Sequence, residues 1–308
     1  MTFSRFTIGS RGSPLALAQA RMVASALEQA HGWNPGSVDI KVVKTSGDRI
    51  QDRPLAEVGG KALWTKELDL ALLAGETHCS VHSMKDVESE RPESLHIAAM
   101  LPRADVRDRL VGADSIAMLP LGALVGTSSP RRAAQLKRLR SDLELVPIRG
   151  NVDTRLAKLK AGEVRATLLA AAGLDRLGRP EVGVAIDIAQ MLPAPAQGAI
   201  GIECRADDPA TVALLSKIDH FDTHQAVLAE RAFCRSLGGT CHSPVAAFAR
   251  IEGEEIALTC EILSEDGREH VARSRRFAIG DLIAPASLAR DMLEAAPPAI
   301  RQLFEPDE

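Results

Sequence analysis

The chain has 308 residues, of which 45% are hydrophobic and 25% charged, so we expect a folded protein of about two or three domains. A net charge of −4 and an aromatic content of 3%, without any Tyr, argue against a nucleic-acid-binding protein. The five cysteines are an odd number, which argues against a disulfide framework. Without a signal peptide or an apolar run long enough to cross a membrane, we expect a cytoplasmic protein.

The N-terminal part of the chain alternates strands with helices. Ser13 followed by Pro14 is typical of a helix N-cap and first turn. The segment 45–63 is polar and contains glycines, and a loop of this length in a compact domain is usually functional or mobile. We predict helices at 14–29 and 64–73, and strands at 3–8, 38–44, 79–82 and 97–101.

A second alternating set follows a hinge-like segment at 102–105. Its predicted strands are 124–126, 143–148 and 167–171, its helices are 130–140, 152–161 and 174–177, and a strand at 199–203 returns to the first sheet. Such alternation is typical of parallel sheets. Two lobes between which the chain passes twice would leave a cleft between them. We therefore predict one α/β lobe from 1–101 and 198–218, and another from 104–194.

The C-terminal part, 222–308, changes to an α+β pattern. After helices at 208–218 and 223–236, we predict strands at 245–250, 256–263 and 269–279 and a final helix at 285–294. Asp266 and Gly267 are typical of a hairpin turn between the last two strands. This part should therefore form a small domain with a three-stranded antiparallel sheet.

Three polar side chains, Ser83, Lys85 and Asp86, follow the predicted short buried strand 79–82. Ligands of open α/β sheets bind at the carboxyl ends of strands, so this turn is a candidate site. A lysine beside an aspartate would place a cation and a carboxylate together. A solvated turn would explain an isolated Lys-Asp pair more simply. The choice between a solvated turn and a ligand site therefore depends on evidence from other parts of the chain.

The second candidate is the basic segment 131–165, with ten Lys or Arg against four Asp or Glu. Arg131 and Arg132 lie at a predicted helix start, Arg149 follows a predicted strand, and Arg11 occupies the equivalent turn of the first lobe. Helix N-termini attract anions, and guanidinium groups bind carboxylate or phosphate through paired hydrogen bonds. We predict anion binding there, whereas basic residues within the helices more simply solvate helix faces.

Cys241 lies in a loop with two glycines, beside His242. A free cysteine is most often a small buried hydrophobic residue. In an accessible loop it can instead ionise and serve as a nucleophile or a covalent attachment point. The cysteines lack zinc-ligand spacing, and Cys79 with His82 offers only two ligands, so we predict no metal site.

Several ordered motifs make the chain resemble the porphobilinogen deaminase (hydroxymethylbilane synthase) family nearly from end to end. They are GSRGSPLAL (9–17), TSGD (45–48), GGKAL (59–63), VHSMKD (81–86), GTSSPRR (126–132), IRGN (148–151), AAGLDR (171–176) and QGAIGIECR (197–205). The resemblance implies two periplasmic-binding-protein-like lobes with mainly parallel sheets around a cleft, plus a C-terminal domain that carries the cofactor cysteine. It also implies a monomer.

The activity that the resemblance implies is that of a transferase in tetrapyrrole (haem-type) biosynthesis. It would join four porphobilinogen molecules head to tail into hydroxymethylbilane and release ammonia at each step. A dipyrromethane cofactor, bound to Cys241 by a thioether, would serve as primer. Each pyrrole carries an acetate and a propionate, which suits the arginines. Loss of ammonia leaves a cationic azafulvene, and a carboxylate beside the pyrrole nitrogens stabilises such charge as it develops.

The resemblance also assigns roles to individual residues. Asp86 matches the catalytic position, where we rate it first as an electrostatic stabiliser. The residues implied to bind the cofactor are Cys241, Lys85, Ser83, Ser129, Arg131, Arg132, Arg149, Arg155, Asn151 and Gly150. Those implied to bind substrate are Arg11, Ser13, Gln19, Arg149, Arg155, Arg176 and Gln197.

The chain departs from the family pattern at a few positions. Before Cys241 it has Leu-Gly-Gly-Thr where Leu-Glu-Gly-Gly is usual, Trp64 stands where Phe is common, and Ala196 where Gly often precedes Gln197. A different class of protein, a two-lobed binding protein for small anions, would also use the arginines. The missing export sequence and the Cys241 loop speak against that alternative.

Overall fold

The computed structural model describes residues 6–45, 65–238 and 243–304. The chain divides into two compact units, one made of Met1–Arg53, Val58–Ala104 and Gly198–His224, the other of Pro54–Glu57, Asp105–Gln197 and Gln225–Glu308. Within the described residues, no helix is both long and apolar enough to cross a lipid bilayer. The predicted loop at 45–63 and the Cys241 loop fall almost wholly outside the described residues.

The first unit is built on a five-stranded sheet in the order β2-β1-β3-β10-β4. The strands β1, β2 and β3 are parallel, whereas β10 runs antiparallel to both β3 and β4. The strands are β1 (Phe6–Ser10), β2 (Val38–Val42), β3 (Cys79–Ser83), β4 (Leu95–Met100) and β10 (Ile200–Arg205). The helices are α1 (Pro14–His31), α4 (Lys66–Leu73), α8 (Pro209–Leu215) and two 3₁₀ turns, η1 (Met84–Asp86) and η2 (Ser216–Ile218).

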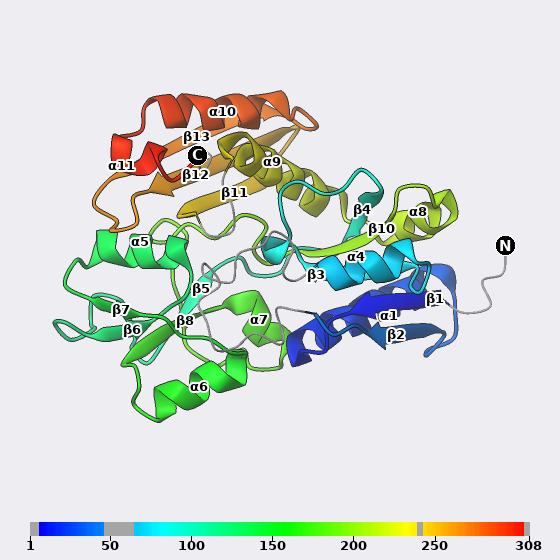
Figure 1. Cartoon of the computed structure of the whole chain (residues 1–308), viewed down its shortest axis with the longest axis horizontal. Coiled ribbons are helices and arrows are strands. Elements are labelled where there is room, and N and C mark those ends of the chain that lie inside the picture. Colours follow the sequence, from blue (N-terminus) through cyan, green and yellow to red (C-terminus); the bar gives the residue numbers. More distant parts are fainter. Residues whose placement is uncertain (1–5, 46–64, 239–242, 305–308) are drawn as a thin grey trace. The chain divides into compact units, whose positions relative to one another are not determined.

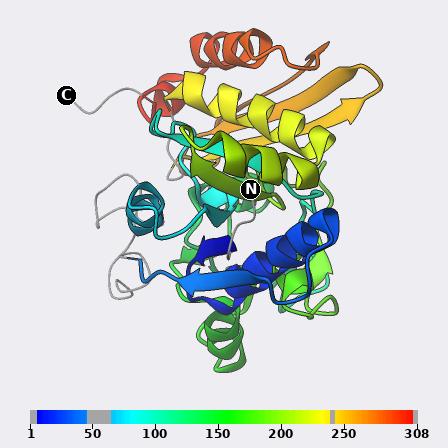
Figure 2. The same cartoon turned by 90° about the vertical axis from the view of Figure 1, so that its right-hand side faces the viewer.

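Helix α1 begins where the sequence predicts it. The Ser13 side chain accepts a hydrogen bond from the backbone N–H of Ala16, and Pro14 occupies the first turn, where its missing N–H is harmless. In two views α1 lies alongside β1 and β2 (Figures 1 and 2). Its buried face, including Val23 and Leu27, packs on the sheet and so fixes the loop after β1.

The second unit contains a sheet of the same design, in the order β7-β6-β8-β5-β9. Three strands are parallel, and β5 runs antiparallel to β8 and β9. Its elements are β5 (Asp108–Val111), β6 (Leu124–Gly126), α5 (Pro130–Leu139), β7 (Glu144–Val146), α6 (Val152–Lys160), β8 (Ala166–Ala170), α7 (Ala171–Arg176) and β9 (Val184–Ala185). Both sheets are therefore mixed rather than mainly parallel, and strands β5 and β9 were not predicted.

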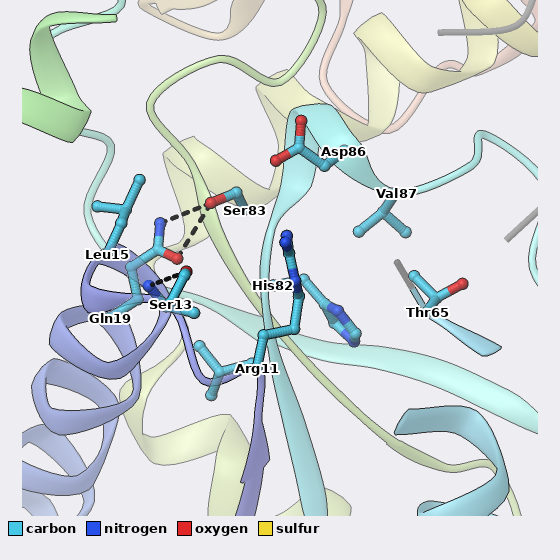
Figure 3. A pocket seen from close by; sticks show the side chains of 11 residues that line it. Arg11, Ser13, Leu15, Gln19, Thr65, His82, Ser83, Asp86 and Val87 are labelled. Carbon is cyan, nitrogen blue, oxygen red and sulfur yellow. Dashed lines mark hydrogen bonds between the residues drawn. The ribbon is translucent and has the colours of Figure 1, made fainter. Parts of the chain in front are cut away.

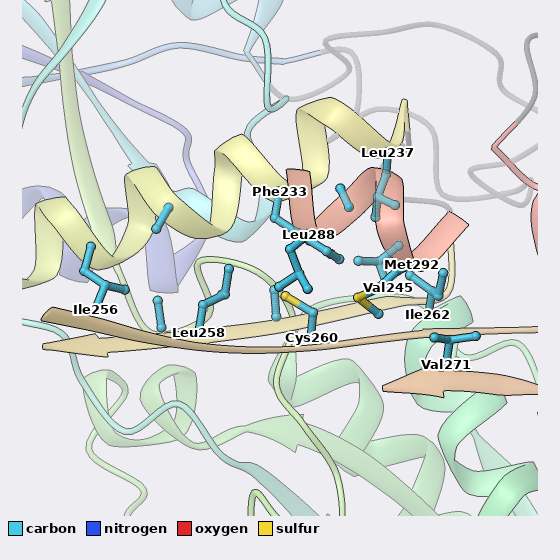
Figure 4. Close-up of a cluster of buried hydrophobic side chains, with 14 of the residues drawn as sticks. Phe233, Leu237, Val245, Ile256, Leu258, Cys260, Ile262, Val271, Leu288 and Met292 are labelled. Atoms are coloured by element: carbon cyan, nitrogen blue, oxygen red, sulfur yellow. The ribbon is translucent and has the colours of Figure 1, made fainter. Parts of the chain in front are cut away.

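The second unit also contains the predicted three-stranded antiparallel sheet, in the order β11-β12-β13. Its strands are β11 (Val245–Glu252), β12 (Glu255–Leu263) and β13 (His270–Ala278), and its helices are α9 (Phe221–Leu237), α10 (Ile283–Glu294) and α11 (Pro298–Arg301). Figure 4 shows Phe233 of α9 and Leu288 and Met292 of α10 directed at Leu258 and Cys260 of the sheet. Burial of these side chains holds helices and sheet together, at about 1.5–3 kcal/mol for each large one.

Candidate functional site

The predicted catalytic turn follows β3 directly, as the 3₁₀ turn η1. Met84 is buried and anchors the turn, and its backbone N–H donates to the carbonyl of Ala199. This anchoring leaves Lys85 and Asp86 half-buried at the end of the strand. A pocket opens here, and it is lined by Arg11, Ser13, Leu15, Ala16, Gln19, Thr65, Val81, His82, Ser83, Asp86 and Val87 (Figure 3).

Asp86 has the carboxylate that is most available in this pocket. It accepts no hydrogen bond and forms no ion pair with any other residue in the described part of the chain. Figure 3 shows Arg11 extending from the loop after β1 toward the end of the turn that carries Asp86, and both residues line the same pocket. A half-buried carboxylate without a protein partner is suited to a donor or a cation supplied by a ligand.

Ser13, Gln19 and Ser83, three residues with predicted roles, lie on the α1 side of the pocket (Figure 3). The Gln19 amide donates to Ser83 Oγ over 2.8 Å, and the Ser83 hydroxyl donates back to Gln19 Oε1 over 3.0 Å. Ser13 accepts the capping hydrogen bond of α1, so its own hydroxyl proton is available for another acceptor. The structure thus brings Arg11, these three residues and Asp86 to one pocket.

A buried ionic network behind this pocket was not predicted from the sequence. The His82 ring contacts Glu203 Oε2 over 3.1 Å, and Arg91 donates to both oxygens of Glu203 over 2.8 and 2.9 Å. Burial alone would raise the pKa of Glu203, but His82 and Arg91 outweigh it and lower that pKa to about 2. The sequence feature that could have revealed this network is Glu203 inside an otherwise apolar strand, because a buried charge requires a partner.

In the second unit, Asp108 at the start of β5 binds two of the predicted arginines. Arg131 Nη2 and Arg132 Nη2 each donate to one Asp108 oxygen over 2.7 Å, and all three side chains are buried. Gln197 Nε2 also donates to Asp108, over 2.9 Å. Two guanidinium groups against one carboxylate leave a net positive charge in this cluster. The arginines therefore bind a protein carboxylate, while their predicted contact with ligand carboxylates remains a prediction.

Other predicted residues of this unit gather at the N-termini of α5 and α6. Ser129 Oγ caps α5 by accepting from Arg132 N, and Asn151 Oδ1 caps α6 by accepting from Thr154 N. Gly150 has a φ of +108°, and a Cβ there would lie 2.5 Å from Thr154 Cβ, so only glycine fits. Arg149 is half-buried and forms no ion pair with another residue that the structure describes.

Arg155 and Arg176 have partly protein-bound guanidinium groups. Arg155 Nε donates to the carbonyl of Gly150 over 3.0 Å. Burial lowers the pKa of Arg176 to about 10, with Asp175 opposing the shift, so the side chain is still protonated at neutral pH. A half-buried guanidinium with a lowered pKa favours an anionic partner.

Cys241, the predicted attachment point, lies outside the described residues, as does Trp64. The described cysteines Cys79, Cys204, Cys234 and Cys260 are unpaired. Burial raises the pKa of each of these four thiols, which makes them poor nucleophiles. Among the residues with described positions, no group of three or more His, Cys, Asp or Glu could hold a metal ion.

Fold and site together define an α/β protein with a pocket that contains a half-buried aspartate without a partner among the described residues. A family model described as "Porphobilinogen deaminase, dipyromethane cofactor binding domain" matches residues 6–213, and "Porphobilinogen deaminase, C-terminal domain" matches residues 224–292. The chain is 57% identical over 303 residues to a porphobilinogen deaminase of Sphingopyxis alaskensis, with 96% of each chain covered. It is 49% identical over 290 residues to that of Paracoccus denitrificans, which covers 93% of this chain and 92% of the relative.

The chain belongs to the porphobilinogen deaminase family. It is an enzyme of tetrapyrrole biosynthesis that has porphobilinogen deaminase activity and uses a dipyrromethane cofactor.

Proposed function

We propose that the enzyme joins four porphobilinogen molecules head to tail into hydroxymethylbilane, and that Asp86 is its catalytic carboxylate. The observation that carries the role of Asp86 is its position in the pocket of the first unit without a partner among the described residues. A carboxylate held there can accept a hydrogen bond from a pyrrole N–H. It also stabilises positive charge as that charge develops on the pyrrole nitrogen during loss of ammonia.

A dipyrromethane has pyrrole N–H donors and several carboxylates, and side chains within each unit, taken separately, suit one of these two kinds of group. Asp86 suits the N–H groups, and the guanidinium of Arg149, without an ion pair in the described part of the chain, suits a carboxylate. The Ser129 hydroxyl accepts a backbone N–H and so keeps its proton for an anion. When bound, the cofactor supplies the pyrrole carbon to which substrate is joined. The residues we propose to hold it are Cys241, Lys85, Ser83, Ser129, Arg131, Arg132, Arg149, Arg155, Asn151 and Gly150.

Substrate binding follows from the same electrostatics. Each added pyrrole brings further carboxylates, and charge-assisted hydrogen bonds to guanidinium groups are the strongest that such groups form. The cluster around Asp108 carries two arginines against one acid, which favours an anion in its neighbourhood. The residues we propose to contact substrate are Arg11, Ser13, Gln19, Arg149, Arg155, Arg176 and Gln197.

We further propose a cytoplasmic monomer of three domains, at 1–101 with 198–218, at 104–194 and at 222–308. Three separate sheets and four unpaired described cysteines support this organisation. Light scattering during size-exclusion chromatography would test the oligomeric state, and a particle of twice the chain mass would contradict the proposal.

Replacing Asp86→Asn tests the proposed catalytic role. The amide has the same shape but no charge, so we expect folded enzyme whose kcat falls by about 10²- to 10³-fold, because the developing positive charge loses its stabilising carboxylate. Activity should be measured per molecule of cofactor-loaded enzyme, with loading taken from the intact mass. Asp114→Asn is the matched control, since Asp114 is exposed and outside the pocket. Turnover of Asp86→Asn near that of the control would remove Asp86 from the catalytic role.

A further inference from the structure

Arg91 lies behind the turn that carries Asp86 and joins several segments of the first unit. Its Nε and Nη2 donate to Glu203 of β10, as described above, and Nη2 also donates to Asp69 Oδ1 of α4 over 2.6 Å. Its Nη1 donates to Glu88 Oε2 over 3.0 Å and to Thr65 Oγ1 over 3.2 Å. One guanidinium group therefore contacts β10, α4, the residue before α4 and the segment that follows η1.

The network holds the turn from both sides. His82, the residue before Ser83, contacts Glu203, while Glu88, two residues after Asp86, contacts Arg91. Glu203 and Arg91 are bound to each other by two hydrogen bonds, so both ends of the turn are attached to one rigid pair. His82 also lines the pocket itself, so the network reaches the surface on which Asp86 lies (Figure 3).

The burial of these charges makes a purely stabilising role a poor explanation. The Glu203 side chain is 0% exposed and the Arg91 side chain 9% exposed. Desolvation of a buried ion pair offsets most of its attraction, and packed apolar residues often stabilise a fold as well or better. A buried network of hydrogen bonds fixes the positions of its members, because each donor and acceptor tolerates only a narrow range of partner distances and angles.

We propose that Arg91, acting through Glu203 and His82, is a positioning residue that fixes the turn bearing Asp86 for reaction. This inference rests on the proposed role of Asp86. A displacement of about 1 Å in a reacting group lowers rates by up to 100-fold. The ion pair of Arg91 with Glu203 opposes such a displacement of Asp86. Arg91 itself is not among the residues that line the pocket, so it acts only through the others.

The test compares Arg91→Gln and Arg91→Lys with the unmodified holoenzyme. Lysine restores the charge but not the paired hydrogen bonds, whereas glutamine removes both. Arg205→Gln is the matched control, because Arg205 lies on β10 as well and pairs with Asp207 and Asp208 outside the network. For each protein, cofactor loading, melting temperature, kcat and KM are measured, with kcat followed from pH 6 to pH 8.

We expect Arg91→Gln to lower kcat by about tenfold or more with little change in KM, because the pocket keeps its binding groups while Asp86 is misplaced. Arg91→Lys should recover part of that loss. The groups facing the Arg91 position are Asp69, Glu88, Glu203 and His82, three acids and one imidazole. Without Arg91, protonation of the buried Asp69 or Glu203 carboxylate removes one of the uncompensated negative charges, so kcat of Arg91→Gln relative to the unmodified enzyme should rise as pH falls.

Two outcomes would overturn the inference. One is a kcat for Arg91→Gln within about twofold of the Arg205→Gln control at every pH. The other is a fall in activity of Arg91→Gln that is fully explained by a smaller amount of folded, cofactor-loaded enzyme. In that case the pH profile would not shift and Arg91→Lys would recover no activity. If Asp86→Asn is inactive in the same assay, either result refutes the role of Arg91 alone. If Asp86→Asn keeps the turnover of its Asp114→Asn control, the proposed catalytic role of Asp86 is refuted as well.

Discussion

Asp108 is a buried carboxylate that forms ion pairs with two buried arginines of the second unit. Burial alone would raise its pKa, but Arg131 and Arg132 outweigh burial and hold that pKa well below its ordinary range. The carboxylate thus remains ionised and orients both guanidinium groups. Arg131 Nη1 also donates to Gln135 Oε1, and Gln135 Nε2 donates to Glu261 of β12, so the same arginine is linked to the C-terminal sheet.

Asp108→Asn should therefore destabilise the protein strongly. Two buried guanidinium groups would lose their carboxylate, which costs about 3–5 kcal/mol in free energy of unfolding at neutral pH. Because the folded-state pKa of Asp108 is lowered, its stabilisation is present above its unfolded pKa of about 3.9 and is lost as pH falls below that value. Urea unfolding at decreasing pH should show the difference from the unmodified protein shrinking progressively below about pH 4. A difference that stays constant or widens there would contradict this account.

Local sequence could not identify the partners of these charged residues. Arg131 and Arg132 follow a helix start and were expected to face a ligand, but Asp108 lies more than twenty residues earlier in the chain. They meet only in the folded unit, where β5 pairs with β8 and Arg132 of α5 donates to the carbonyl of Leu168 on β8. The same holds for Arg91 and Glu203, which are 112 positions apart. In contrast, the capping roles of Ser13 and Ser129 depend on a few neighbouring residues and could be read from the sequence.

At the scale of elements, α1 and the three C-terminal strands were predicted well because their periodicity and caps are local signals. Strand β5 was missed, since Asp-Arg-Leu-Val is short and begins with two charged residues. Strand β9 has only two residues and is defined by its pairing with β5. Strand β10 was expected to return to the first sheet, but its antiparallel direction depends on where the chain re-enters that sheet, which composition does not reveal.

The packing of β10 against η1 gives a prediction at this scale. A Cβ at Gly201 would lie 2.1 Å from Met84 Sδ and 2.8 Å from its Cγ. Gly201→Ala should therefore push Met84, the first residue of η1, out of place, at about 1–3 kcal/mol of stability. Because the turn moves, kcat should fall more than stability explains. The double variant Gly201→Ala/Met84→Ala removes the clashing atoms and should recover part of kcat relative to Gly201→Ala. A Gly201→Ala enzyme with unchanged kcat would show that this packing does not position Asp86.

At the scale of the whole molecule, the described residues pass between the two units near residues 104, 197 and 224. The passage at 197 is constrained, because Ala196 has a φ of 59°, which is unfavourable for any residue with a Cβ. Glu230 Oε2 accepts from Ala196 N over 2.6 Å, and Glu230 Oε1 accepts from Ala249 N over 2.7 Å. This buried carboxylate fixes the segment that precedes Gln197 and links it to α9 and β11.

We propose that the dipyrromethane primer of this deaminase is bound to Cys241. The most direct test is the intact mass of the denatured, purified protein, compared with that of Cys241→Ser. We predict that the unmodified protein exceeds its sequence mass by one dipyrromethane, and that Cys241→Ser has the bare sequence mass and no deaminase activity. An unmodified protein that is active at its bare sequence mass, or a Cys241→Ser protein that still carries the extra mass, would contradict the account.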